Sequence, residues 1–256
     1  MDSKKPILVV TAGGRNPQIL INALAERFAD VSVLEEQPES KKLFLKRRAK
    51  KLGYLTAAGQ FATMAASKFG KRFTEKRAEE IIRDYGVSDA PNGKVPVTRV
   101  DSINSPEAMT HIARLQPAVV FLVSCRMLTA ATLSTIACPV INFHAGINPQ
   151  YRGLMGGYWA RVRNDLDNFG STVHLVDTGV DTGGTLYQQR LTPAKNDTLH
   201  TYPLLQTAAA TGIAIRAVDD AIAGRLVAQT GNFPSRQWYH PPIWTWAWNG
   251  VVKGIW

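Results

Sequence analysis

Apolar runs separated by helical patterns divide the first part of the chain into strands and helices. Residues Ile7–Thr11 form a short apolar run that predicts a strand, and a glycine-rich turn, AGGRNPQ, follows it. Alternating apolar and polar residues predict a second strand at Val31–Leu34. Between the two strands, apolar residues recur at the three- to four-residue spacing of a helix with one buried face, at Ile19, Leu20, Ala23, Leu24 and Phe28.

The middle of the chain repeats this order of strand and helix. The segment VPVTRV predicts a short strand, and Ser105 suits the N-cap of a helix that ends near Leu115. The continuous apolar runs at 117–123 and 139–144 are typical of central parallel strands buried on both faces. Thr129 can cap a short helix between them. Strands alternating with helices favour an α/β fold with a doubly wound, mainly parallel sheet, in which ligands bind beyond the carboxyl ends of the strands.

Two further strands and a long helix are predicted after residue 170. The segments STVHLVD and TLYQQRL flank the loop TGVDTGG, as expected for two strands joined by a glycine-containing connection. Apolar residues then recur every three or four positions from Thr198 to Gly224. We therefore expect one long helix there, with Asp197 or Thr198 as its N-cap.

The composition is that of an ordinary globular protein. The 256 residues are 45% hydrophobic and 20% charged, which excludes disordered and fibrous classes. The two cysteines, Cys125 and Cys138, cannot form a disulfide framework and have no nearby companion residues, so no metal site is predicted and a reducing cytoplasm fits best. The apolar run at the amino terminus is too short for a signal peptide or a membrane span.

The net charge of +10 comes from one segment. Residues 41–83 contain 13 Lys or Arg and 3 Glu, so the rest of the chain is balanced. Such a segment attracts phosphates, anionic lipid or nucleic acid; the alternative is a solvated helical insertion whose lysines serve solubility. Its apolar face is expected to pack onto the main body, a partner or a membrane surface, through Leu43, Leu45, Leu52, Leu55, Phe61, Met64 and Phe69.

The last 19 residues contain five of the six tryptophans. A tail of this kind packs over an exposed edge of a core or forms a homodimer contact. Peripheral membrane contact is the other interpretation, because aromatic rings favour the headgroup zone and anionic lipid attracts lysines. We expect a domain at 1–225 with a basic helical insertion at about 40–90, followed by an aromatic tail at 226–256.

One pair of polar residues is suited to acyl transfer. Asn142 and His144 lie two positions apart on a predicted strand end, so their side chains face the same side. A carboxamide N–H can stabilise an oxyanion, and an imidazole can move protons near neutral pH. An acid is needed to orient the histidine, and Asp181 in the glycine-flanked loop GVDTGG is the best candidate.

The order and spacing of NFHAGINPQYRG and GSTVHLVDTGVDTGG resemble the folate-dependent formyltransferase family. The resemblance implies a Rossmann-like fold and transfer of a formyl group from 10-formyltetrahydrofolate to an amine. It implies that Asn142 and His144 bind the oxyanion, that His144 moves protons, and that Asp181 orients His144 and receives the amine proton. His174 matches a family position for which a structural role is favoured.

The same resemblance assigns residues to the co-substrate. The segment SCRMLT, 124–129, matches the part of the family whose backbone holds the pterin ring, and the loop Val176–Val180 closes the other side of this pocket. The predicted folate-binding residues are Cys125, Arg126, Met127, Leu128, Val176, Asp177 and Val180. Asp177 is the weaker candidate acid beside Asp181.

Two segments are candidates for the acceptor. The turn TAGGRN can present backbone N–H groups to a phosphate at the start of the following helix, although a tight turn without ligand is the alternative, and no complete dinucleotide-binding motif is present. The family usually has a serine and two leucines where this chain has Gly146, Ile147 and Asn148, so the acceptor side is expected to differ. The predicted acceptor-binding residues are Gly13, Gly14, Arg15, Asn16, Tyr151, Arg152 and Gly153.

The resemblance leaves the amine open. A phosphate-bearing amino sugar linked to a nucleotide is favoured. Initiator methionyl-tRNA is the closest alternative, disfavoured because little chain follows Asp181 for a separate tRNA-binding barrel. Glycinamide ribonucleotide and a hydroxylamine-bearing siderophore precursor are further alternatives. A non-catalytic membrane-binding or scaffold protein on the same fold is the hypothesis from another class.

Overall fold

The computed structural model describes residues 5–229 and 233–256, with the side chains of Lys41, Lys42, Phe44 and Lys71 left out. The first four residues of the predicted domain and residues 230–232 of the predicted tail therefore lie outside the described residues.

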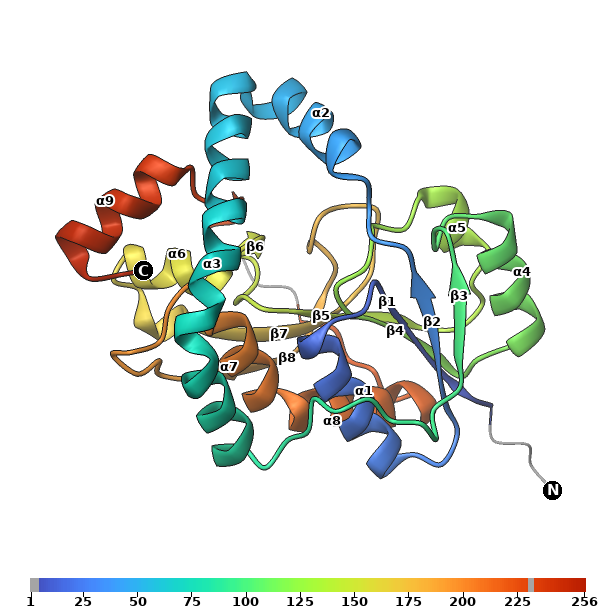
Figure 1. The fold of residues 1–256 in the computed structure, drawn as a ribbon. Coiled ribbons are helices and arrows are strands. Elements are labelled where there is room, and N and C mark those ends of the chain that lie inside the picture. The colour runs from blue at the N-terminus through green and yellow to red at the C-terminus, as the bar shows by residue number, and fades with distance from the viewer. Residues whose placement is uncertain (1–4, 230–232) are drawn as a thin grey trace.

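Seven strands form one sheet in the order β3-β2-β1-β4-β5-β7-β8 (Figure 1). Successive residues of β1 alternate between two hydrophobic clusters, Ile7 and Val9 in one and Leu8 and Val10 in the other, so both faces of the sheet are buried. The first five strands of this order pair in parallel, and the β5–β7 and β7–β8 pairings are antiparallel, which confirms the predicted mainly parallel sheet. The strands are β1 (Ile7–Thr11), β2 (Val31–Glu36), β3 (Val97–Val100), β4 (Val119–Leu122), β5 (Val140–His144), β7 (Gly170–Leu175) and β8 (Thr185–Arg190).

Helices cover both faces of the sheet (Figure 1). Helices α1 (Arg15–Arg27) and α8 (Thr211–Ile222) pack on one face, and α4 (Pro106–Leu115) and α5 (Ala130–Ser134) on the other. The two predicted N-caps are confirmed. The Ser105 hydroxyl accepts a hydrogen bond from the Ala108 N–H at 3.2 Å, and the Thr129 hydroxyl accepts one from the Thr132 N–H at 3.1 Å.

The prediction of one helix from Thr198 to Gly224 is wrong in one respect, because the segment forms two helices. Helix α7 (Tyr202–Ala209) ends at Ala210, and α8 begins one residue later. Both helices pack on α1, but α7 also packs on α3 (Tyr54–Asp84) and α6 (Gly156–Val162), whereas α8 packs mainly on strands β4, β7 and β8, so the packing surface changes between the two helices. Apolar spacing continues through this junction and does not reveal it. Thr201, rather than Asp197 or Thr198, precedes the first turn.

The basic segment forms α2 (Lys41–Leu52) and the long helix α3 (Tyr54–Asp84), which meet at Gly53 with φ at 85°. The inner face of α3 buries small and polar side chains, among them Ala57 and Thr63. Of the three surfaces expected to receive the apolar face, the main body does not cover Leu55 and Phe69, which are 76% and 71% exposed. The first part of α3 rises beyond the sheet in Figure 1.

The C-terminal residues return to the body. Strand β9 (Gln237–Trp238) pairs with β6 (Arg152–Gly153), and α9 (Ile243–Lys253) packs on α3. Trp238 and Ile255 are buried in a cluster that also contains residues of α6 (Gly156–Val162), beside the 3-10 turn Leu166–Asn168. The boundary expected at 225 and 226 stays a prediction. Among the described residues, no helix has the length and hydrophobicity to cross a bilayer.

A buried ion pair joins α3 to the segment before α7. Arg77 Nε donates to Asp197 Oδ1 at 2.8 Å, and the Asp197 carboxylate also accepts from the Ala194 N–H at 2.7 Å and the Thr201 hydroxyl at 3.1 Å. The Asp197 side chain is fully buried. Hydrogen bonding to Asp197 raises the pKa of Arg77, although burial opposes this shift.

We expect Arg77→Ala to lower the free energy of unfolding by about 3 to 5 kcal/mol, because it leaves the Asp197 carboxylate buried without its cation. Urea denaturation measures this loss. Arg83→Ala on the same helix is the matched control and should change stability little, since its ion pair with Asp84 is exposed. Equal effects of the two substitutions would contradict the anchoring role of Arg77.

Candidate active site

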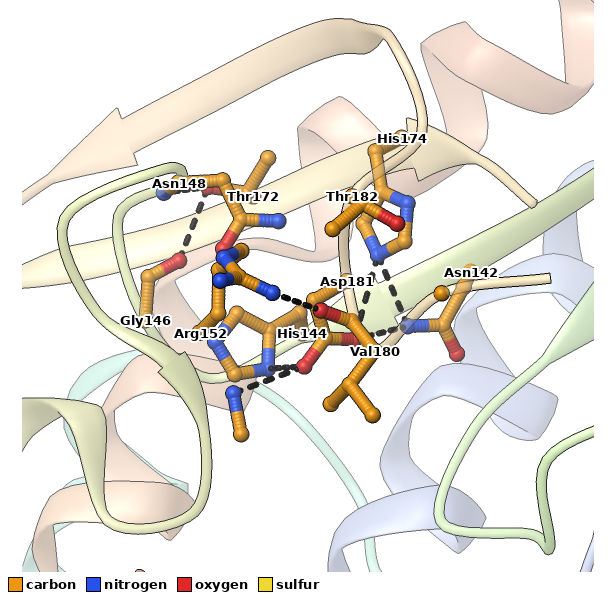
Figure 2. Close-up of polar contacts among 12 residues, drawn as sticks. Asn142, His144, Gly146, Asn148, Arg152, Thr172, His174, Val180, Asp181 and Thr182 are labelled. Carbon is orange, nitrogen blue, oxygen red and sulfur yellow. Dashed lines mark hydrogen bonds and ion pairs between the residues drawn. The ribbon is translucent and has the colours of Figure 1, made fainter. Parts of the chain in front are cut away.

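The carboxyl end of β5 and the neighbouring strand β7 bring three polar side chains together. Asn142 and His144 are two residues apart on β5, so they face the same side as predicted. The antiparallel register places His174 of β7 opposite Asn142, and Thr172 opposite His144. His174 therefore lies in the site beside the two predicted residues (Figure 2).

Asp181 completes the cluster from the loop between β7 and β8 (Figure 2). Its Oδ2 lies 3.5 Å from His144 Nδ1 and accepts a hydrogen bond from the Gly153 N–H at 2.8 Å. Its Oδ1 lies 3.4 Å from His174 Nε2. The structure thus brings Asn142, His144 and Asp181 together although the residues come from two separate parts of the chain.

Electrostatics favours an ionised Asp181. Burial alone would raise the pKa of this carboxyl, but the nearby His144, the contacts with His174 and the Gly153 N–H outweigh burial and hold the pKa well below its usual range. The residue adopts the left-handed conformation, with φ at 50°. A carboxylate of this kind stays charged at neutral pH and can hold a positively charged group beside it.

Hydrogen bonds define the proton positions on His144. Its Nε2 lies 2.7 Å from the carbonyl oxygen of Tyr151, which only accepts, so Nε2 carries a proton. Its Nδ1 faces the carboxylate of Asp181. Both ring nitrogens of His144 are thus engaged by the protein.

Gly146 makes this orientation of His144 feasible. A Cβ atom at Gly146 would lie 2.4 Å from the Tyr151 carbonyl oxygen and 2.5 Å from His144 Nε2, closer than such atoms pack. The glycine expected to reshape the acceptor side therefore allows the loop after β5 to fold back onto the histidine. Thr172 fastens the same loop, since its hydroxyl donates to the Gly146 carbonyl at 2.8 Å and accepts from the Asn148 N–H at 3.0 Å (Figure 2).

Asn142 and His174 orient each other. The Nδ1 of His174 donates to the Leu175 carbonyl at 2.7 Å, and its Nε2 lies 3.0 Å from Asn142 Nδ2 and 3.4 Å from Asp181 Oδ1. The same Nδ2 donates to Asp181 Oδ1 at 3.4 Å. Both hydrogens of the carboxamide thus point into the cluster, and donation to a bound ligand requires the carboxamide to rotate.

A cavity of about 1050 Å³ opens above this cluster at the carboxyl ends of β1, β4 and β5. This is the point in a doubly wound sheet where the strand order reverses, between β1 and β4. A volume of this size accommodates two sizeable small molecules. Asn142, His144, His174 and Asp181 all line the cavity.

The predicted folate segment lines one side of the cavity. Residues 122–129 contribute to the wall, and Val176, Asp177 and Val180 from the loop after β7 face the same space. Cys125 is not a reactive thiol, because burial raises its pKa to about 12. The Asp177 carboxylate accepts from the Thr182 hydroxyl at 2.6 Å and the Gly179 N–H at 2.9 Å, so it shapes the loop and does not contact His144.

Glu36 holds the folate segment in place. Its carboxylate is buried at the end of β2 and accepts from the backbone N–H of Arg126, from Arg126 Nη1 at 3.1 Å and from the Ile103 N–H at 2.9 Å. The Arg126 guanidinium is bound to Glu36 and to two backbone carbonyls, those of Gln37 and Asp101. The sequence signal that could have revealed this role was an acidic residue at the end of the second strand. Such a residue usually suggests ribose binding, whereas here it binds Arg126.

The glycine-rich turn contributes less to the cavity than expected. Gly13 and Gly14 adopt positive φ angles of 77° and 113°, and Asn16 lines the cavity. Arg15 is turned toward Asp89 and Glu75, with which it forms ion pairs. Its guanidinium is therefore already neutralised, and the phosphate-binding role of this turn stays a prediction.

Arg152 and Gly153 hold the Asp181 loop, and Tyr151 anchors the loop after β5. The Tyr151 hydroxyl donates to Asp165 Oδ2 at 2.7 Å. Arg152 Nη1 donates to the Val180 carbonyl at 2.7 Å (Figure 2), and the Gly153 N–H binds Asp181. Of the three, only Gly153 lines the described part of the cavity. Acceptor binding by these residues stays a prediction, while their contacts position the carboxylate.

Sequence reasoning also missed a group of cations on the opposite wall. Arg47, Arg48 and Lys51 of α2 line the cavity together with Tyr239 of the C-terminal segment. Arg48 and Lys51 lie over the Tyr239 ring, at 4.6 and 5.4 Å from its centroid. The surplus of basic residues was the sequence signal, but only the fold reveals which of them reach the cavity.

The geometry can be compared with known proteins. A methionyl-tRNA formyltransferase from Geobacter sulfurreducens is 27% identical over 136 residues, which cover 45% of this chain and 42% of the relative, so the chain spans about half the length of such relatives. A phosphoribosylglycinamide formyltransferase from Coxiella burnetii superposes with a TM-score of 0.56 at 21% identity, over 89% of this chain and 90% of that one.

An N-formyltransferase from Helicobacter canadensis, solved with folinic acid and dTDP-3-aminofucose, has a TM-score of 0.55 at 12% identity, over 91% of this chain and 70% of that one. At these identities the solved structures establish the fold alone. The profile of the formyl transferase family matches residues 4–218, which include β5, the Asp181 loop and α7. This chain therefore belongs to the formyl transferase family.

Proposed function

We propose that the protein is an N-formyltransferase that moves a formyl group from 10-formyltetrahydrofolate to the primary amine of a nucleotide-linked amino sugar. The observation that carries this proposal is the convergence of Asn142, His144 and Asp181 on one cavity at the switch point of the sheet. The family to which the chain belongs supports formyl transfer as the reaction.

Formyl transfer needs stabilisation of an oxyanion and movement of protons, and these residues can provide both. The amine nitrogen attacks the formyl carbon, the bond from that carbon to folate N10 breaks, the amine loses a proton and N10 gains one. The carboxamide of Asn142 and the imidazole of His144 supply hydrogen bonds to the oxygen that becomes negative during attack, once each side chain rotates away from its present contacts. Ionised Asp181 orients His144 and takes up the amine proton.

The wall formed by residues 122–129 and 176–180 suits the folate. Its backbone is held by Glu36, and Asn104 adds two bonds, donating to the Met127 carbonyl at 3.0 Å and accepting from the Thr129 N–H at 2.8 Å. A wall fastened in this way can present backbone groups to a flat ring without rearranging. The binding of folinic acid by the Helicobacter canadensis structure supports a tetrahydrofolate in this position.

The opposite wall suits an acceptor with negative charge. Arg48 and Lys51 bring positive charge to the cavity, and burial lowers the pKa of the Arg48 guanidinium, so a bound anion would stabilise its charged form. Lys51 also donates to Gln237 Oε1 at 3.3 Å. A sugar linked to a diphosphate would place its phosphates here and its amine near His144. The free cysteines fit a cytoplasmic reaction.

A second candidate acceptor is initiator methionyl-tRNA. The curated relatives act in that reaction by name, and the basic segment 41–83 would attract a polyanion. The two candidates separate in one experiment. Purified protein is given 10-formyltetrahydrofolate with nucleotide-linked amino sugars, glycinamide ribonucleotide or charged initiator tRNA, and release of tetrahydrofolate is followed. Turnover with an amino sugar alone supports the proposal, and turnover with tRNA alone overturns it.

Substitutions in the cluster should abolish turnover without unfolding the protein. We expect Asn142→Ala to lower kcat/KM by roughly 100- to 1,000-fold through loss of an oxyanion donor. His144→Ala and Asp181→Asn should lower kcat/KM by roughly 100- to 10,000-fold. Steady-state kinetics measures these losses, with His111→Ala on α4 as a control that keeps normal turnover. Near-normal rates for His144→Ala would refute the mechanism.

The lowered pKa of Asp181 makes a pH-dependent contribution to stability. A carboxyl whose pKa is depressed by folding stabilises the protein above its ordinary pKa of 3.8, and this contribution is lost as pH falls further toward the lowered value. The gap in free energy of unfolding between wild type and Asp181→Asn should therefore be constant at neutral and mildly acidic pH and shrink below about pH 4. Urea denaturation across pH checks this, and a gap that widens on acidification would contradict it.

The cations of α2 should act on the acceptor and not on the folate. We expect Arg48→Met combined with Lys51→Met to raise the acceptor KM by roughly 30-fold or more, since each lost contact to an anion weakens binding by about 1 kcal/mol or more. The KM for 10-formyltetrahydrofolate should stay constant. Lys50→Met, at an exposed position on the same helix outside the cavity wall, is the matched control. Parallel increases in both KM values would argue against a specific acceptor contact.

A further inference from the structure

Two segments of the chain that lack acidic residues pack against each other. Residues 40–74 contain ten Lys or Arg and no Asp or Glu, and residues 221–256 contain three Lys or Arg and again no Asp or Glu. The first segment provides α2 and most of α3, and the second provides α9. Helices α3 and α9 lie side by side (Figure 1). The charged residues of these two segments are therefore all basic, although the segments are far apart in the sequence.

Helix α9 turns an apolar face to solvent. Apart from Lys253 at the last position, its exposed residues are apolar and follow the helical spacing i, i+3, i+4, i+7, i+8: Trp244, Ala247, Trp248, Val251 and Val252. Trp248 is 65% exposed and Val251 77%. The polar Asn249 is turned inward, where its Nδ2 donates to the Tyr158 hydroxyl at 2.9 Å. This distribution is the reverse of that on a solvated helix.

Helix α3 carries a second apolar stripe. Leu55, Phe69 and Phe73 are 76%, 71% and 89% exposed, and all belong to one face. The stripe consists of Leu55, Ala58, Phe61, Ala65, Phe69 and Phe73. Trp244 links the two stripes, because a Cβ atom on Gly59 of α3 would lie 2.4 Å from the Trp244 ring. We call these exposed residues of α3 and α9 the α3–α9 surface.

We propose that the α3–α9 surface docks on a bilayer that contains anionic phospholipid. Apolar and aromatic side chains enter the headgroup region while neighbouring Lys and Arg attract the lipid charge. Exposed Lys68, Arg72 and Lys76 lie on or beside the α3 stripe in the positions that this arrangement requires. Neither element of the surface has an acidic residue before Glu75, which is paired with Arg15.

Charge and chemistry favour lipid over other occupants. A second copy of the chain would bring two basic surfaces together, which is repulsive. A nucleic acid would use the basic side chains but would gain little from Leu55, Val251 and Val252, since phosphates do not bind aliphatic groups. A bilayer uses both kinds of side chain. The proposal does not depend on formyl transfer, because it rests on residues outside the catalytic cluster.

The test is sedimentation of the full chain with vesicles, in the absence of folate and acceptor. We expect binding to phosphatidylcholine vesicles containing phosphatidylglycerol and roughly tenfold weaker binding to phosphatidylcholine alone. Trp248→Ser with Val251→Ser, and Phe69→Ser with Phe73→Ser, should each weaken binding at least tenfold. Lys68→Glu with Arg72→Glu should abolish the preference for the anionic lipid.

Matched controls separate docking from folding. Ile222→Ser with Val227→Ser removes exposed apolar side chains outside the α3–α9 surface, and this variant should bind vesicles like wild type. All substituted positions are exposed, so unfolding temperatures should stay unchanged. Failure to bind anionic vesicles would overturn the proposal. So would a solution dimer, seen by light scattering, that the Trp248 and Val251 variant dissociates, or binding to RNA without binding to vesicles.

Discussion

The ionised carboxylate of Asp181 is the interaction on which the rest of the site depends. One oxygen meets His144 and the backbone N–H of Gly153, and the other meets His174 and Asn142. A buried carboxylate is stable when it is surrounded by donors and positive charge, and here four groups from three chain segments provide them. The loop after β5, the loop after β7 and the β5–β7 register therefore have to form together.

This dependence explains several features around the site. The loop after β5 folds back so that the Tyr151 carbonyl holds His144, and glycine is needed at position 146 to let it pass. Arg152 reaches from the same loop to the Val180 carbonyl beside Asp181. The backbone of β6 is paired with β9, so the C-terminal segment also supports the carboxylate. Regions distant in sequence thus contribute to the position of the Asp181 carboxylate.

The outer part of the molecule follows a different physical logic. Helix α2 adds cations to the wall of the cavity. Helix α3 presents apolar side chains to solvent next to α9. Burial drives the folding of the catalytic body, whereas these helices keep large apolar groups exposed, which a soluble protein does sparingly. One insertion thereby carries both the cations proposed to bind the acceptor and part of the surface proposed to dock on lipid.

Local patterns along the sequence determined the strands, most helices and two of the caps, because hydrophobic periodicity and capping act within a few residues. The motif around Asn142 and His144, with Asp181 in a glycine-flanked loop, was sufficient to predict that these three side chains converge and to predict the family. Tertiary structure alone decided the rest. His174 enters through an antiparallel register, Glu36 turns to a loop 90 residues away in sequence, and the 198–224 segment bends where its packing surface changes. Exposure of Leu55 and Phe69 also depends on which neighbours reach α3, and such long-range contacts leave no local pattern in the chain.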